Sequence, residues 1–207
     1  SPDTTAFVLF TSGSTGTPKG ILITHKAFAS SIRGHGKVLR FTTGPGSRNF
    51  QYTAYTSDVH LGEIFTSLAL GSCVCVPSDW DRKNDIPGAM RDLNVNWAFF
   101  TPSVATLLRP SEVPSLRTLV FGGETASAEN FATWAPSLYL INSFGPAECS
   151  IWSHCIPRQV ELSDFGSNIG YGVSCATWIT DPDDCNKLLP IGAIGELLTE
   201  GPNVAAG

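Results

Sequence analysis

The sequence predicts an α/β protein with a doubly wound, mostly parallel sheet and flanking helices, followed by the start of a β-rich subdomain. Three observations predict this fold class. Short apolar runs alternate with segments of helical spacing, and that helical pattern stops near Ile151. The chain of 207 residues is also 42% hydrophobic and 15% charged, which is the composition of a globular protein with enough length for a buried core.

The first elements alternate clearly. Ala6–Thr11 is a continuous apolar run, which predicts a strand buried on both faces. After a loop rich in Ser, Gly and Thr, Ile21–Thr24 predicts a second short strand. His25–Leu39 carries apolar residues at helical spacing. Phe50–Ala54 predicts a further strand, and Leu61–Leu70 is apolar at helical spacing and long enough for a helix.

The alternation continues at shorter intervals. Ser72–Pro77 predicts a strand that is closed by proline, and Asp85–Leu93 predicts a helix. Trp97–Phe100 is a short apolar strand. Pro102–Leu108 opens with proline in its first turn, which is typical of a helix. Leu116–Phe121 predicts a strand that ends at two glycines.

Ala128–Trp134 completes the helices, and Ser137–Ile141 completes this set of strands. Ligands of doubly wound sheets bind beyond the carboxyl ends of the strands. The loops expected on this one rim follow Phe10, Phe100, Phe121 and Ile141.

Two later segments, Ala176–Thr180 and Gly195–Thr199, predict strands separated by turns. We therefore divide the chain into an α/β subdomain over residues 1–150 and the start of a β-rich subdomain over residues 151–207.

Composition excludes several classes of function. The net charge of -5 argues against a nucleic-acid surface. No run of 18 apolar residues predicts a membrane span, and no secretory signal is visible, so we expect a cytoplasmic protein. The six cysteines are expected to be buried reduced thiols, and none has zinc spacing. The first residue is Ser1 rather than Met, so we expect either a piece of a longer protein or a processed one.

One segment has the composition of a phosphate-binding loop. It runs Thr11-Ser12-Gly13-Ser14-Thr15-Gly16-Thr17-Pro18-Lys19-Gly20. Glycines free the backbone to turn its N–H groups toward an anion, hydroxyls add donors, and Lys19 adds a positive charge. It is not a Walker loop, because Gly20 follows the lysine. Composition alone leaves a flexible surface turn as the alternative.

A second segment lies directly after a predicted strand. It runs Asn142-Ser143-Phe144-Gly145-Pro146-Ala147-Glu148. Phe144 can stack on a purine, Asn142 can bond its exocyclic amine, and Glu148 can hold Mg²⁺. A turn with a buried phenylalanine is the alternative.

These segments resemble motifs of the adenylate-forming enzymes: the first their signature loop, the second their Asn-x-Tyr-Gly-Pro-Thr-Glu motif. Two weaker matches are Gly122-Gly123-Glu124, similar to the segment against the adenine, and Gly195-Glu196-Leu197, similar to a later structural motif. Together the motifs span essentially the whole chain. The resemblance implies ATP and Mg²⁺ as cofactors, Lys19, Thr11 and Glu148 as catalytic residues, and Glu148 at the metal. It implies nucleotide binding by Ser12, Gly13, Ser14, Thr15, Gly16, Gly123, Glu124, Asn142, Phe144 and Gly145.

Within this family, the chain most resembles adenylation domains of nonribosomal peptide synthetases, and residues 71–78 look especially like the fungal ones. The argument depends on Asp58, since an Asp at this place pairs with the substrate's α-ammonium in members that activate amino acids. A cap on the following helix is the alternative role. The pocket carried over from the family consists of Asp58, Val59, Gly62, Phe99, Val120, Gly122, Ser143, Ile151 and Trp152. Beyond Asp58 this lining has no charge, which favours a largely apolar amino acid without identifying it.

The resemblance implies formation of an aminoacyl adenylate with release of pyrophosphate, and loading of the phosphopantetheine arm of a carrier protein. It implies neighbouring synthetase domains as partners, and no nucleic acid or membrane. Alternatives are an acyl-CoA or aryl-acid synthetase, against which Asp58 argues, and a non-catalytic subdomain.

The sequence departs from the family at Ala147, where a Thr is usual, and at Ser57, where an aromatic residue is common. The family's ribose-binding Asp and its C-terminal lid with the catalytic Lys have no counterpart in these residues. We therefore expect the parent protein, rather than this part alone, to be the complete enzyme.

Overall fold

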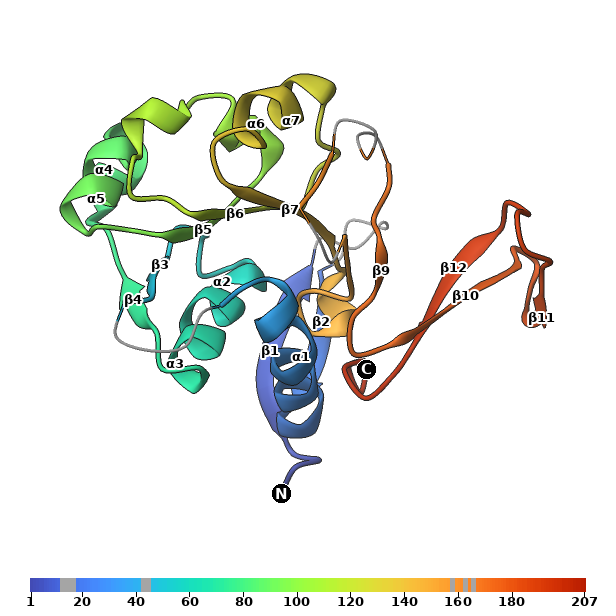
Figure 1. Ribbon diagram of the computed structural model, residues 1–207. Helices are drawn as coiled ribbons and strands as arrows, with labels where there is room; N and C mark the ends of the chain where they lie inside the picture. Colours follow the sequence, from blue (N-terminus) through green and yellow to red (C-terminus); the bar gives the residue numbers. More distant parts are fainter. Residues whose placement is uncertain (12–17, 42–45, 157–158, 162–163, 165–166) are drawn as a thin grey trace.

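The computed structural model describes residues 1–11, 18–41, 46–156, 159–161, 164 and 167–207. Its centre is a mixed sheet made of β3 (Arg48–Phe50), β4 (Cys73–Cys75), β5 (Trp97–Phe100), β6 (Thr118–Phe121), β7 (Tyr139–Phe144), β8 (His154–Cys155) and β9 (Tyr171–Gly172). The seven strands lie in the order β4-β3-β5-β6-β7-β8-β9 (Figure 1). Pairing from β4 to β7 is parallel, and β8 and β9 add antiparallel strands. The predicted mostly parallel sheet with flanking helices is therefore confirmed.

Helices cover both faces of this sheet (Figure 1). On one face lie α1 (His25–Val38), α2 (Val59–Leu61), the π-helix η1 (Gly62–Thr66) and α3 (Ser67–Ala69). On the other face lie α5 (Ile86–Asp92), α6 (Pro102–Ala105) and α7 (Ala128–Trp134). The remaining helical elements are α4 (Asp79–Asn84), η2 (Pro110–Glu112) and η3 (Ala147–Cys149).

Two hydrophobic cores result, one on each face, because successive side chains of a strand point to opposite sides. Ala98 and Phe100 of β5 pack into the core beneath α5, α6 and α7. Trp97 and Phe99 of the same strand pack into the core beneath α1 and α2. This second core also contains Trp152, so it borders the pocket predicted for the substrate.

The N-terminal strands differ from the prediction. β1 (Thr5–Thr11) and β2 (Lys19–Thr24) form their own antiparallel two-stranded sheet rather than joining the central one. Burial of β1 on both faces is also wrong, since Leu9 is buried while Phe10 is 68% exposed. In a separate hairpin only one face of the strand meets the core.

The strand predicted at Phe50–Ala54 is wrong beyond its first residue, because β3 ends at Phe50. Side chains take the backbone hydrogen bonds that a neighbouring strand would have made. Glu63 accepts from the N–H groups of Tyr52 and Thr53, at 3.1 Å each to Oε2, and Arg82 Nη1 donates to Tyr52 O at 2.7 Å. Residues 51–54 therefore form a loop whose backbone is fixed by the side chains of Glu63 and Arg82.

Other elements follow the predictions with shifted ends. The helix predicted at Leu61–Leu70 exists as Val59–Ala69, but its middle is the π-helix η1. The helix α4 was not predicted, because its polar sequence lacks apolar periodicity; Ser78 caps it by accepting from Asp81 N at 3.1 Å. The boundary at residue 150 stays a prediction, and β8 and β9 extend the central sheet beyond it.

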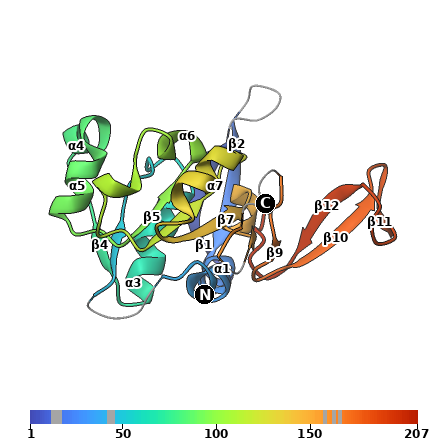
Figure 2. The same ribbon diagram turned by 45° about the horizontal axis from the view of Figure 1, so that its top comes forward.

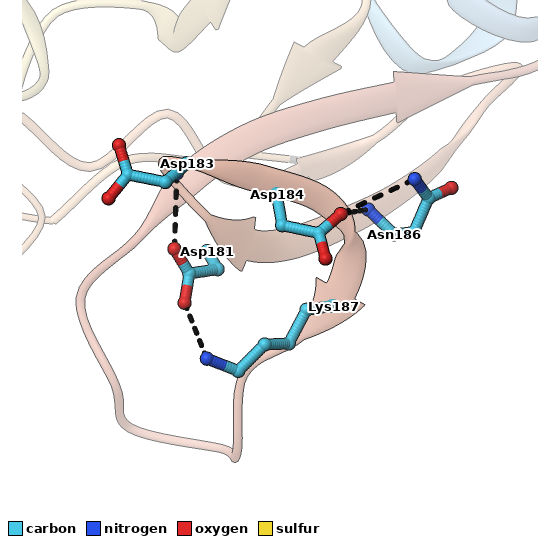
Figure 3. Close-up of polar contacts among 5 residues, drawn as sticks. All are labelled: Asp181, Asp183, Asp184, Asn186 and Lys187. Carbon is cyan, nitrogen blue, oxygen red and sulfur yellow. Dashed lines mark hydrogen bonds and ion pairs between the residues drawn. The ribbon is translucent and has the colours of Figure 1, made fainter.

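A second sheet of three antiparallel strands extends away from the rest of the chain in both views (Figures 1 and 2). It contains β10 (Ala176–Asp181) and β12 (Glu196–Glu200), near the two predicted strands, and β11 (Asp184–Leu188), which is exposed throughout and was not predicted. The β10–β11 turn is held by polar contacts, with Lys187 Nζ 2.7 Å from Asp181 Oδ2 and Asn186 N donating to Asp184 Oδ1 at 3.0 Å (Figure 3).

All six cysteines are free thiols. The expectation that they are buried is wrong for Cys73 and Cys185, which are exposed. Among the helices that the structure describes, none has both the length and the apolar character needed to cross a membrane.

Candidate active site

Two adjoining pockets lie beyond the carboxyl ends of β5, β6 and β7. The larger pocket has a volume of about 630 Å³ and the smaller pocket about 330 Å³. Thr101, Gly122 and Phe144 bring the ends of the three strands to the larger pocket. The rim expected after Phe100, Phe121 and Ile141 is therefore present. Thr11, at the end of β1, lines neither pocket. The residues common to both pockets are Gly123, Ser143, Phe144 and Gly145.

The larger pocket gathers most of the predicted substrate-binding residues. Those that line it are Asp58, Val59, Phe99, Gly122, Ser143, Ile151 and Trp152. Gly62 and Val120 do not line it. Val120 is fully buried in β6, and Gly62 lies beneath Trp152.

The rings of Trp152 and Phe99 occupy the space next to Gly62 and Gly122, respectively. A Cβ on Gly62 would lie 2.4 Å from Cζ3 of Trp152, and one on Gly122 would lie 2.9 Å from Cε2 of Phe99. Trp152 is 2% exposed and its ring centroid is 5.8 Å from that of Phe99. Close packing of this kind gives the inner wall a fixed, apolar shape.

Asp58 is the acidic residue of the larger pocket. It precedes α2, but its side chain makes no capping hydrogen bond, so the alternative role as a helix cap is wrong. Ser57 Oγ lies 3.5 Å from Asp58 Oδ1 and donates to it, and within the part of the chain that the structure describes no cation pairs with this carboxylate. Burial, with a smaller contribution from the charge of Glu148, raises the pKa of Asp58 to about 6. A half-buried carboxylate with no countercharge is suited to a cationic ligand.

The resemblance did not identify the outer wall of the larger pocket. Tyr52, Thr53, Arg82 and Lys83 lie there. Glu63 is fully buried and accepts hydrogen bonds from residues 51–53, which fixes this side of the pocket. Burial raises the pKa of Glu63 to about 8 although these hydrogen bonds act to lower it. Glu63 lies 10 to 12 positions after the residues it contacts, and the only sequence signal of these contacts was an isolated Glu in an apolar run.

The smaller pocket contains all the described residues predicted for the nucleotide. They are Gly123, Glu124, Asn142, Phe144 and Gly145. Phe144 is 39% exposed, which contradicts the alternative of a turn around a buried ring. A Cβ on Gly145 would lie 1.8 Å from Ile151 O, so the close approach of two backbones requires glycine here. Lining residues that the sequence did not identify include Thr125, Ser167, Asn168 and Ile169.

Asn142 and Glu124 are already hydrogen-bonded. Asn142 Nδ2 donates to Asn168 O at 2.8 Å, and Glu124 Oε2 accepts from Ser103 N at 3.0 Å. Among the described residues, no hydrogen-bond partner occurs for Asn142 Oδ1 or Glu124 Oε1, so these two acceptor atoms are open to a ligand.

The predicted catalytic residues lie outside both pockets. Thr11 and Lys19 face each other across the β1–β2 hairpin, at the base of the predicted phosphate loop. Ser12, Gly13, Ser14, Thr15 and Gly16 lie outside the described residues. Glu148 is exposed on η3, close enough for its charge to act on Asp58. No cluster of three or more His, Cys, Asp or Glu occurs among the described residues. A lone carboxylate fits Mg²⁺, which is commonly shared between one protein carboxylate and phosphate oxygens.

This combination of fold and site defines an α/β protein with two adjoining pockets at the carboxyl ends of its parallel strands, the usual place for small-molecule ligands in such folds, and one of these pockets carries the carboxylate of Asp58. More specifically, the chain belongs to the AMP-binding enzyme family, whose family model matches residues 1–207.

Its relatives include fungal nonribosomal peptide synthetases. The chain is 68% identical over 206 residues to nonribosomal peptide synthetase GRA1 of Gibberella zeae, and 46% identical over 207 residues to resC of Aspergillus sclerotiorum. Both matches cover 100% of this chain, but only 3% and 16% of the two relatives. The chain therefore spans a small part of these proteins.

Solved structures share the fold. PA1221, a nonribosomal peptide synthetase protein containing adenylation and PCP domains, matches with a TM-score of 0.80 and 25% identity, over 100% of this chain and 37% of its own. The McyG A-PCP structure, complexed with phenylalanyl-adenylate, matches with a TM-score of 0.82 and 22% identity, over 100% of this chain and 36% of its own.

Proposed function

We propose that the chain forms the acid- and nucleotide-binding part of an enzyme that activates an α-amino acid. The acid's carboxylate attacks the α-phosphorus of ATP, the bond to pyrophosphate breaks, and aminoacyl-AMP and pyrophosphate result. The thiol of a carrier protein's phosphopantetheine arm then takes the aminoacyl group and AMP leaves. The observation that carries the proposal is Asp58, a carboxylate in the larger pocket without a cationic partner among the described residues.

The two pockets divide the substrates between them. The larger pocket takes the amino acid, with its ammonium at Asp58 and its side chain against Phe99 and Trp152. The smaller pocket takes the nucleoside of ATP, with Phe144 available for stacking. The residues that both pockets share support this arrangement, since ligands in the two pockets would lie side by side, and such alignment is a large part of catalysis of this kind.

The negative charge on the phosphates is neutralised by the loop that starts at Thr11 and ends with Lys19. Glu148 would hold Mg²⁺, which supplies positive charge to the phosphate oxygens when bound. Ala147 removes one hydroxyl that the family usually offers, a loss on the order of 1 kcal/mol for one hydrogen bond.

The relatives support the proposal, because those reported above are named nonribosomal peptide synthetases. The adenylation–PCP structures support a carrier protein as partner. Since the chain is a small part of the relatives, the activity is proposed for the full-length protein that contains it.

Amino-acid-dependent exchange of labelled pyrophosphate into ATP tests the proposal. We expect the full-length protein to catalyse exchange with one or a few largely apolar amino acids. The matched acids without the α-amine are the control, and they should support little exchange. Equal exchange with these acids contradicts the amino-acid assignment and favours acyl or aryl activation. No exchange with any acid contradicts adenylation itself.

A further inference from the structure

Two buried histidines that the proposed reaction does not use pack against the aromatic walls of the site. His35 on α1 is 0% exposed, and its ring meets Trp152 edge-on with centroids 4.8 Å apart. His154 on β8 is 1% exposed, and its ring lies 6.0 Å from that of Phe144. Trp152 lines the larger pocket, and Phe144 lines both. Each histidine thus contacts one aromatic ring that lines a pocket: His35 contacts Trp152 of the larger pocket, and His154 contacts Phe144 of both pockets.

The hydrogen bonds of His35 fix its ring. Ser31 Oγ donates its single proton to Ser150 O at 2.6 Å, so at 3.1 Å it accepts from His35 Nδ1. Nε2 of the neutral ring then accepts from Thr66 Oγ1 at 2.8 Å. Burial lowers the pKa of His35 to about 3, which agrees with a neutral ring. The imidazole therefore joins α1 to the π-helix η1 and, through Ser31, to the segment before Trp152.

That segment is strained, so its position depends on such ties. Ser150 and Ile151 have φ of 55° and 89°, in the left-handed region that β-branched residues rarely adopt. Ser31 holds the carbonyl of Ser150, and Ser150 Oγ donates to Asn203 O at 2.7 Å. Trp152 follows directly, and its indole fills the space over Gly62.

His154 is held in a similar way on the other side. Its Nδ1 is 2.8 Å from Ser153 Oγ and its Nε2 is 2.8 Å from Thr177 Oγ1. Its backbone pairs with Phe144 across β7 and β8. Burial lowers its pKa as well. The ring therefore links β8, which pairs with the strand that carries Phe144, to β10.

We propose that His35 and His154 are positioning residues, each for one substrate. His35 fixes the position of the Trp152 indole, which contacts the acid substrate, and His154 fixes the position of the Phe144 ring, which contacts the nucleotide. The inference rests on the proposed function for the identity of the two ligands. Neither histidine is among the described residues that line the larger or the smaller pocket, so each acts through the aromatic ring it contacts.

The test compares Michaelis constants for the two substrates in pyrophosphate exchange by the full-length protein. We expect His35→Asn to raise the KM for the acid by about three- to tenfold, the size of one lost aromatic contact, and to leave the KM for ATP within about twofold. His154→Asn should do the reverse. His35→Phe and His154→Phe keep a ring against Trp152 or Phe144 but lose its hydrogen bonds, so each constant should lie between that of the asparagine variant and that of the unaltered protein. His25→Asn, at an exposed histidine of the same helix α1, is the matched control and should change neither.

Equal changes in both Michaelis constants for either asparagine variant would refute the proposal that each histidine acts on one substrate. If His35→Asn does not fold, Ser31→Ala removes only the hydroxyl between Ser150 O and His35, and it should also raise the acid's KM alone; an unchanged acid KM refutes the inference. A structure of the His35→Asn protein gives a readout independent of activity. The inference requires the Trp152 indole to leave its place over Gly62, and an unmoved indole overturns it even where exchange itself has failed.

Discussion

Replacing Asp58 by asparagine removes a charge from the larger pocket while keeping the shape of the side chain. The carboxylate caps no helix and has no cationic partner among the described residues. Removing its charge should therefore change the free energy of unfolding only slightly. The binding free energy of the amino acid should fall much more, because its ammonium would then lie in a largely apolar pocket without a countercharge.

The size of the effect follows from the surroundings of Asp58. Removing one partner of a desolvated charge pair costs 2 to more than 5 kcal/mol, and Asp58 is half-buried before the ligand arrives. We therefore expect a loss of about 2–4 kcal/mol, which corresponds to about a 30- to 700-fold fall in kcat/KM for the amino acid. The matched acid without an amine pays no such penalty, so its kcat/KM should stay within about threefold.

The assay is pyrophosphate exchange with both acids, from pH 5 to pH 8. Burial raises the pKa of Asp58 to about 6, so its carboxylate takes up a proton as the pH falls below that value. Only the ionised form pairs with an ammonium. The kcat/KM of the unaltered protein for the amino acid should therefore fall about tenfold per pH unit below about pH 6, and this limb should be absent in the Asp58→Asn variant.

Asp79→Asn removes an equal charge from the exposed helix α4 and serves as the matched control. It should behave as the unaltered protein does. The reasoning is refuted if Asp58→Asn keeps its preference for the amine-bearing acid, or if both variants lose it equally.

Three further predictions concern the phosphates and the backbone. Lys19→Ala should raise the KM for ATP about tenfold through loss of a charge-assisted contact, and unchanged exchange kinetics would show that the loop is a surface turn. Glu148→Gln should raise the Mg²⁺ concentration needed for half-maximal exchange, since an amide is a poorer ligand for a hard cation; the same Mg²⁺ dependence would place Glu148 away from the metal. Gly145→Ala should lower the free energy of unfolding by about 2 kcal/mol or more in denaturant titrations, because the new Cβ would lie 1.8 Å from Ile151 O. Gly46→Ala, where nothing lies within 4 Å, should change it by less than about 0.5 kcal/mol, and equal effects of the two would contradict the packing argument.

The layers of the fold could be predicted because their signals are local. The apolar run of β5 specifies a strand buried on both faces, and the structure sends Trp97 and Phe99 to one core and Phe100 to the other. The site could be assembled only through the resemblance, which supplied Asp58 and Trp152 from segments 94 residues apart (152 − 58).

What could not be predicted depends on long-range contacts. The loop after Phe50 has a strand-like sequence, but Glu63 and Arg82 take its hydrogen bonds. The sequence of η1 has helical spacing, and nothing local indicates a π-helix. The sequence predicts that Trp152 occupies the room left by Gly62, and the structure adds how close the contact is, since a Cβ at Gly62 would lie 2.4 Å from Cζ3 of the indole.

The contact between Gly62 and Trp152 also restricts the order in which the pocket can evolve. A side chain added at Gly62 first would meet the indole at 2.4 Å, so the intermediate would be overpacked and unstable. A smaller residue in place of Trp152 first would leave a hole that a bulkier substrate can fill, and only afterwards does position 62 become free to vary. Lineages that change the amino acid they accept are therefore expected to pass through position 152 before position 62. A laboratory library that randomises both positions should show the same dependence, with large residues at 62 recovered only beside small ones at 152.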